Sequence, residues 1–161
     1  MGFLSFLRGG SSAAEPSRPA RQAGGTLTGP DDVASARFTS VRFGEGYDVS
    51  EVDDALAGPL IAAWREDREL LDQLERHLGD LRRGTAGSAP IPSRPSARSG
   101  PEAVVHARFA VVRFSEGYAM EDVDLFLDQV HAAWSADLER IAALQSEAEE
   151  LRSPGLEGVE G

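Results

Sequence analysis

The sequence contains neither cysteine nor lysine in its 161 residues. The absence of cysteine excludes disulfide bonds, thiolate metal sites and thiol catalysis. All 16 basic residues are arginines, which together with the many Ala and Gly residues indicates a GC-rich, actinobacterium-like genome. The arginines are scattered and outnumbered by 27 acidic residues, so the formal net charge of -11 argues against nucleic acid as a partner.

Long hydrophobic runs are also absent, since no stretch approaches the roughly 20 apolar residues needed to cross a bilayer. The first ten residues are too short for a secretory core and lack a basic leader and a small-residue cleavage site, so we expect a cytoplasmic protein. We interpret them as a frayed terminus; the alternative is a short segment that touches a membrane or a partner groove. The side chains available for that contact are Phe3, Leu4, Phe6 and Leu7.

The most informative feature that is present is an internal repeat. The segment ARFTSVRFGEGY, residues 36–47, recurs 71 residues later as ARFAVVRFSEGY, residues 107–118, with nine of twelve positions identical. The chain therefore consists of two modules with one plan. We expect a flexible segment at 1–25, a first module at 26–83, a Ser/Pro/Arg linker at 84–98, a second module at 99–152 and a flexible tail at 153–161.

Each module begins with a hydroxyl residue three places before an acid, Thr28 before Asp31 and Ser99 before Glu102. This spacing predicts a capped short helix that runs to about residue 37 in the first module and residue 108 in the second. The next stretch carries Phe and Val without a helical period and is followed by a glycine. It predicts extended chain and then a turn.

A long helix follows in each module. Asp48 can cap the first of these helices, whereas the second module has Ala119 at the equivalent place. The Gly58-Pro59 pair predicts a kink in the first long helix only.

The long helices carry apolar residues at alternating spacings of three and four, which is typical of a coiled-coil seam. The seam consists of Leu60, Trp64, Leu71, Leu74, Leu78 and Leu81 in the first module and Val123, Leu127, Val130, Trp134, Ile141, Leu144 and Leu151 in the second. We interpret the tryptophans as core anchors. The pattern predicts an all-α fold of two tandem helical modules with flexible linkers, which self-associates as a homo-oligomer.

One polar residue interrupts each seam at the same place, three residues after the tryptophan. We interpret Asp67 and Asp137 as facing water; the alternative is that they fix the register of the helices. Parallel pairing within one chain requires the chain to return along about 54 Å of helix. The 15-residue linker, at up to roughly 3.3 Å per residue, reaches about 50 Å, and the start of the second module adds the rest. An antiparallel hairpin needs less reach, and a homodimer that brings four helices together is a further alternative. Sequence alone leaves this orientation open.

The second module combines Arg113-Phe-Ser-Glu-Gly-Tyr118 with Asp122-Val-Asp124-Leu-Phe-Leu-Asp128. This combination resembles the N-terminal domain of the DivIVA family of bacterial division and polar-growth scaffolds, and the resemblance covers residues 26–66 and 97–136. The duplicated form is similar to small DivIVA-domain proteins of actinobacteria. The resemblance implies a head on a parallel coiled coil, with a Phe-Arg pair before Gly-Tyr that touches the membrane.

The sequence departs from the family pattern at that pair, because Gly44-Glu45 and Ser115-Glu116 precede Gly-Tyr. Arg42 with Phe43, and Arg113 with Phe114, are candidates to replace it from one position earlier. We interpret these phenylalanines instead as packing the junction between the short and long helices.

The chain has no Gly-rich phosphate loop, no nucleophile elbow and no paired metal-ligand spacing, so we predict no enzyme activity, no cofactor and no metal. We predict a scaffold or adaptor of cell division or polar growth that binds itself and proteins of the division or envelope machinery. The alternative is a peripheral protein at the inner face of the membrane, the septum or the pole.

Overall fold

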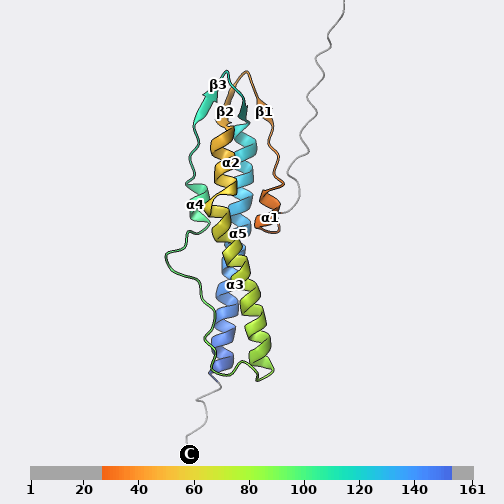
Figure 1. Ribbon diagram of the computed structural model, residues 1–161, viewed down its shortest axis with the longest axis vertical. Coiled ribbons are helices and arrows are strands. Elements are labelled where there is room, and N and C mark those ends of the chain that lie inside the picture. Colours follow the sequence, from red (N-terminus) through yellow and green to blue (C-terminus); the bar gives the residue numbers. More distant parts are fainter. Residues whose placement is uncertain (1–26, 154–161) are drawn as a thin grey trace, which may run out of the picture.

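A computed structural model describes residues 27–153. The first module contributes α1 (Pro30–Val33), β1 (Ser40–Val41), β2 (Glu45–Asp48), α2 (Val49–Ala57) and α3 (Pro59–Arg82). The second contributes α4 (Glu102–Val105), β3 (Val111–Arg113), β4 (Gly117–Tyr118) and α5 (Met120–Arg152). Two helical arms run side by side in the same direction: the first arm is α2 followed by α3, and the second is α5 (Figure 1). The long helices are therefore paired in parallel within one chain.

The all-α prediction is wrong, because the four strands form one antiparallel sheet at the end where both arms begin (Figure 1). The strand order, β1-β4-β2-β3, alternates between the two modules. Each strand has only two to four residues, and each pairs with strands of the other module. Periodicity within one segment cannot report a pairing of this kind, so the sequence shows only extended chain and a turn.

Two glycines lie where the strands of the modules cross. A Cβ atom on Gly46 would lie 2.5 Å from Val41 Cγ2 and 2.8 Å from the Tyr118 carbonyl oxygen, and one on Gly117 would lie 2.7 Å from Val112 Cγ2. The sequence suggested that these glycines permit a turn. Their role is instead to let two backbones approach closely.

The long helices begin as predicted. Asp48 Oδ1 accepts a hydrogen bond from Glu51 N at 3.0 Å and so caps α2, whereas Ala119 makes no side-chain bond at the start of α5. The predicted break near Pro59 is also confirmed, because Gly58 adopts an extended conformation that separates α2 from α3.

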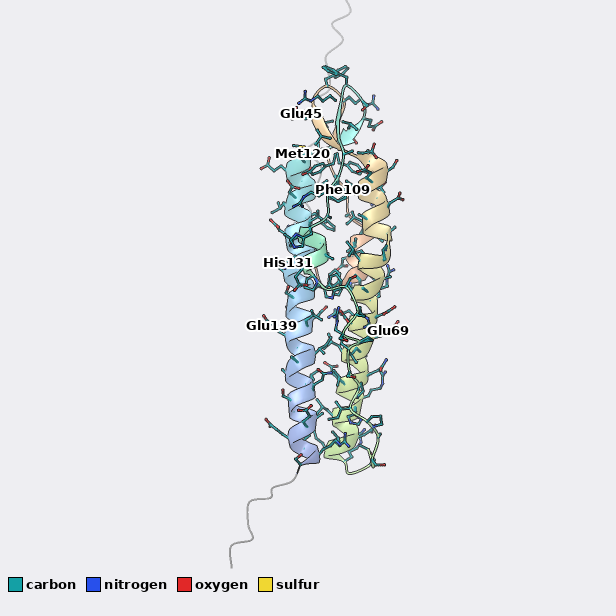
Figure 2. The ribbon with its side chains drawn as sticks, turned by 90° about the vertical axis from the view of Figure 1, so that its left-hand side faces the viewer. Glu45, Glu69, Phe109, Met120, His131 and Glu139 are labelled. Atoms are coloured by element: carbon teal, nitrogen blue, oxygen red, sulfur yellow. The ribbon has the colours of Figure 1, made fainter. Side chains whose placement is uncertain are left out.

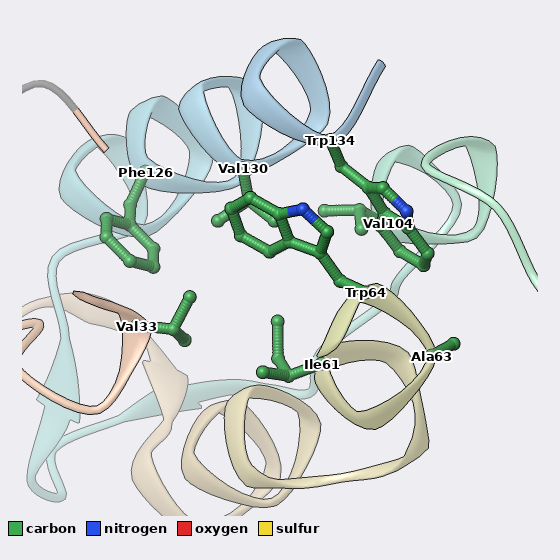
Figure 3. Packing of buried hydrophobic residues seen from close by; sticks show 8 residues of the cluster. All are labelled: Val33, Ile61, Ala63, Trp64, Val104, Phe126, Val130 and Trp134. Carbon is green, nitrogen blue, oxygen red and sulfur yellow. The ribbon is translucent and has the colours of Figure 1, made fainter. Parts of the chain in front are cut away.

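This break compensates for a difference in length between the modules. Tyr47 and Trp64 are separated by one residue more than Tyr118 and Trp134. One extra residue within a continuous α-helix would turn every later side chain by about 100°. Because the helix restarts at Pro59, both tryptophans point between the arms, and their rings stack with centroids 6.2 Å apart (Figure 3).

The short helices are single turns and end well before the predicted limits. Asp32, rather than the predicted Asp31, holds the start of α1, since its carboxylate accepts from Thr28 N, Thr28 Oγ1 and Gly29 N. The hydrogen bonds from Thr28 lower the pKa of Asp32. In α4 no side-chain capping bond forms.

The core lies between the arms and extends under the short helices. Its main cluster contains Val33, Ile61, Ala63, Trp64, Val104, Phe126, Val130 and Trp134 (Figure 3). A second cluster lower on the arms contains Leu70, Leu71, Leu74 and Ile141, with Ile91 of the linker packed against it. The linker was predicted to be a flexible tether, but it runs back along the helix pair as a third packed element (Figure 2).

Candidate functional site

The sheet and the helix ends beneath it form the head of the molecule, in which contacts between the modules occur in equivalent pairs. Thr39 N donates to Asp122 Oδ2 at 3.0 Å, and Ala110 N donates to Glu51 Oε2 at 2.6 Å. Ala110 and Glu51 are the repeat equivalents of Thr39 and Asp122, so the second contact is the same as the first with the modules exchanged. The head therefore has an approximate twofold symmetry that arises from the sequence repeat.

The two tyrosines of the repeat follow the same rule. Tyr47 OH donates to Asp124 Oδ1 at 3.1 Å, and Tyr118 OH donates to Asp53 Oδ1 at 3.3 Å. Burial raises the pKa of both phenols, and the adjacent carboxylate adds to the shift in each case. Each tyrosine thus ties one module to the long helix of the other.

Two grooves flank the head, and each contains residues of both modules. The α1 groove, of about 670 Å³, is lined by residues that include Arg37, Phe38, Asp53, Leu56 and Tyr118. The α4 groove, of about 460 Å³, is lined by the equivalent residues Arg108, Phe109, Asp124, Leu127 and Tyr47. The grooves are the same feature formed twice.

The grooves differ where the two copies of the repeat have diverged. Ala34, Ser40 and Ala57 of the α1 groove are replaced by Val105, Val111 and Asp128 in the α4 groove, and only the α1 groove has the additional cation Arg65. Val105 and Val111 are 48% and 51% exposed. The α4 groove is therefore both more apolar and more acidic.

The tips of the head carry the predicted contact residues of the Phe-containing turns. Phe43 is 96% exposed and Phe114 is 89% exposed, so the interpretation that they pack the junction between helices is wrong. Phe38 does pack there, with its ring 5.4 Å from that of Phe126. Phe114 also has a φ of 60°, a left-handed conformation that a bulky residue rarely adopts.

The arginines of the tips are already paired. Arg42 lies 3.9 Å from Glu116, and Arg113 pairs with Glu45. Each ion pair joins one turn to the other, so the two tips form a single surface with two protruding phenyl rings.

The predicted self-association seam is used within the chain. Trp64, Leu71, Leu74, Leu78, Val123, Val130, Trp134 and Ile141 are buried, whereas Leu60, Leu81, Leu127 and Leu144 are half-buried and Leu151 is exposed. The contact residues Phe3, Leu4, Phe6 and Leu7 lie outside the described residues.

The polar breaks of the seam do not face water, so that interpretation is wrong. Asp67 is fully buried and Asp137 is 9% exposed. Trp134 Nε1 donates to Asp67 at 2.8 Å, and Trp64 Nε1 donates to Asp137 at 2.7 Å. Each aspartate thus accepts from the indole of the other module and aligns the arms.

Sequence reasoning missed Arg94 and Arg98, two linker residues that contact Asp67. It also missed the difference at Asp128. A closer comparison of the repeats shows that difference, since Asp128 stands where the first module has Ala57. The linker arginines give a weaker signal, namely two cations in a segment next to helices whose seams each contain an acid.

Comparison with known proteins finds no matching family model, no matching curated protein and no matching solved structure. Among residues 27–153, no helix combines the length and hydropathy that a membrane span requires.

Proposed function

We propose that this chain is a non-enzymatic adaptor of bacterial cell division or polar growth, in which two DivIVA-like modules build one paired head that binds partner proteins. The observation that carries the proposal is the pair of grooves beside the head. Each groove is open and combines residues of both modules, so it exists only while the modules are paired. Because the seams are filled within the chain, partner binding rather than self-association is the main activity.

The α4 groove is the better partner site. Asp124 and Asp128 are one helical turn apart on α5 and therefore share a face. Val105 and Val111 provide exposed apolar surface in the same groove. Carboxylates form strong charge-assisted hydrogen bonds with guanidinium groups, so the expected ligand is a partner segment in which arginine stands among apolar residues.

Site-specific photo-crosslinking in the native bacterium tests this proposal. A photoreactive amino acid at Val111 in the α4 groove is expected to capture a protein of the division or envelope machinery, and Asp128→Ala is expected to abolish the product. The matched control places the same amino acid at Ser40 in the α1 groove. Equal capture from both grooves would contradict the proposal. A fluorescent fusion of the chain measures its location in the cell, and an even distribution would also contradict the proposal.

A second function, membrane contact, is favoured by the two exposed phenylalanines at the tips. The pairing of Glu45 with Arg113 places Phe43 and Phe114 at the same end of the molecule, where their exposed rings can insert into the lipid interface. The tip arginines pair with glutamates, so binding would depend on burial of the rings more than on attraction to anionic lipids.

Flotation with vesicles of neutral lipid, and of neutral lipid mixed with anionic lipid, tests this second function. The double variant Phe43→Ser/Phe114→Ser is expected to lose binding to both. Phe3→Ser/Phe6→Ser is the matched control and examines the N-terminal alternative. If the control variant loses binding and the tip variant keeps it, the contact belongs to the N-terminus.

A further inference from the structure

The two buried aspartates of the arms obtain their cations from different sources. Asp137 is served by the helix pair itself, because Arg68 of α3 donates to Asp137 Oδ1 at 2.9 Å. The position of α5 that is equivalent to Arg68 is Leu138, which offers no cation to Asp67. Asp137 therefore obtains its cation from the helix pair, whereas Asp67 needs a cation from a segment outside the two long helices.

The outside segment is the linker. Arg94 Nε donates to the two carboxylate oxygens of Asp67 at 2.9 and 3.1 Å, and Arg98 donates to Asp67 Oδ1 at 2.8 Å. Arg98 also pairs with Glu66 at 2.8 Å. The side chains of the two arginines are only 20% and 18% exposed, so the helices enclose them much as a receptor encloses the side chains of a bound peptide.

Two further contacts resemble peptide recognition. Ile91 packs against the lower core cluster, and Gln145 Nε2 donates to the carbonyl oxygen of Pro92 at 2.9 Å. From residue 86 to residue 99 the linker forms neither helix nor strand, and prolines at 90, 92 and 95 favour extended chain. The helix pair thus recognises an apolar side chain, a backbone carbonyl and two guanidinium groups on an extended segment.

We propose that the face of the helix pair around Glu66, Asp67 and Gln145, which we name the strap face, is a second protein-binding site that the chain's own linker occupies. Its external ligand is an extended segment of a partner protein in which an apolar residue is followed by arginines three and seven positions later. This spacing is that of Ile91, Arg94 and Arg98. The proposal goes beyond the adaptor function of the head, because it adds a site on the arms that opens only by exchange.

A partner segment can bind this site only by replacing the linker, so its affinity must be compared with that of the linker. The linker is tethered to helices at both ends, so its effective concentration at the strap face is on the order of millimolar. A free segment of equal quality competes poorly with it. A partner held nearby by another contact gains a comparable effective concentration and then competes with the linker on equal terms.

Fluorescence anisotropy with a labelled peptide of residues 88–100 tests the proposal on the full-length chain. The peptide is expected to bind the Arg94→Ala/Arg98→Ala variant at least about tenfold more tightly than the wild type, whose linker excludes it. Adding Asp67→Asn to the variant is expected to weaken binding by about tenfold or more. Asp128→Ala is expected to change nothing, which separates this site from the α4 groove.

Hydrogen exchange of the wild-type chain keeps the test decisive if the double variant does not fold. Unlabelled peptide in excess over the millimolar effective concentration is expected to speed exchange of the Arg98 amide, which donates to the Pro95 carbonyl oxygen at 3.1 Å in the docked linker. A peptide with both arginines replaced by alanine is expected to leave this exchange unchanged. A folded variant that does not bind the peptide would overturn the proposal. An unchanged exchange rate in the wild type would do the same, and the linker would then be a permanent part of the fold.

Discussion

Asp67 and Asp137 occupy equivalent places in the two arms, yet they are stabilised by different parts of the chain. Both accept a hydrogen bond from the tryptophan of the other module. Asp137 then takes its cation from α3, and Asp67 takes two from the linker. In a symmetric dimer of identical subunits each residue must serve both halves of the interface. Fusion of two modules in one chain removes that constraint, so one half can depend on the linker.

Removing the cations of the two aspartates should give the largest difference in stability between the two sites. Arg94→Ala/Arg98→Ala leaves the buried carboxylate of Asp67 without a cation, and we expect the free energy of unfolding to fall by about 3–5 kcal/mol. Arg68→Ala should cost less, about 1–2 kcal/mol, because the Arg68 side chain is 41% exposed and solvent screens its pair with Asp137. Urea denaturation followed by circular dichroism measures both losses.

Asp67→Asn separates the lost ion pairs from other effects of the linker changes. In the Arg94→Ala/Arg98→Ala background the neutral amide removes the uncompensated charge, so most of the lost stability should return. If the triple variant is no more stable than the double variant, burial of the charge does not explain the loss.

The helix break gives a second contrast between the modules. A Cβ atom on Gly58 would lie 2.6 Å from the Asp54 carbonyl oxygen, so Gly58→Ala forces the backbone to shift and should cost about 1–3 kcal/mol. Gln129→Ala, at a similar place in the unbroken α5, should change stability by less than about 0.5 kcal/mol. Thermal unfolding of both variants checks the difference, and equal effects would show that the close contact at Gly58 has no energetic role.

How much of this fold the sequence predicts depends on the range of each interaction. The Asp48 cap and the break at Pro59 depend on local patterns, and the structure confirms both. The heptad spacing is also local, but it does not say whether the seam is filled within one chain or by another copy. The sheet was missed because Gly46 and Gly117 pair with segments about 70 residues away. Local period carries no information about such crossings.

The candidate sites follow the same division. Comparing the repeats is enough to find the grooves' difference at Asp128, since both copies are visible in one sequence. The burial of Asp67 could not be read locally, because its partners Arg94, Arg98 and Trp134 come from the linker and the other arm. The exposed position of Phe43 and Phe114 likewise depends on the crossed strands that support the tips.

The unequal caps of α2 and α5 offer a smaller test of the comparison. Asp48→Ala removes the bond to Glu51 N and should cost about 1 kcal/mol. Ala119→Asp supplies the missing cap in the second module and should stabilise it by up to about 1 kcal/mol. The double variant exchanges the caps between modules, and chemical denaturation should show it within about 0.5 kcal/mol of the wild type. A double variant as unstable as Asp48→Ala alone would mean that a capping side chain at residue 119 does not stabilise α5.

The tyrosine pair should show the smallest difference, because here the symmetry is nearly complete. Tyr47→Phe and Tyr118→Phe each remove one hydrogen bond to a carboxylate, at a cost of about 0.5–1.5 kcal/mol, with the larger loss for Tyr47 because its bond is shorter. Both phenols have a raised pKa in the folded state. The stability that the two phenols contribute is therefore fully present below their unfolded pKa of about 10. It is lost as pH rises through their higher pKa in the folded state.

Melting temperatures between about pH 9 and pH 12 test this dependence, since arginine stays charged throughout. The wild type should lose stability over this range, each single variant should lose less, and Tyr47→Phe/Tyr118→Phe should lose least. Equal alkaline loss in the wild type and the double variant would show that the two phenols do not couple the modules. If only one single variant flattens the profile, then even this most symmetric contact has diverged, as the two aspartates have.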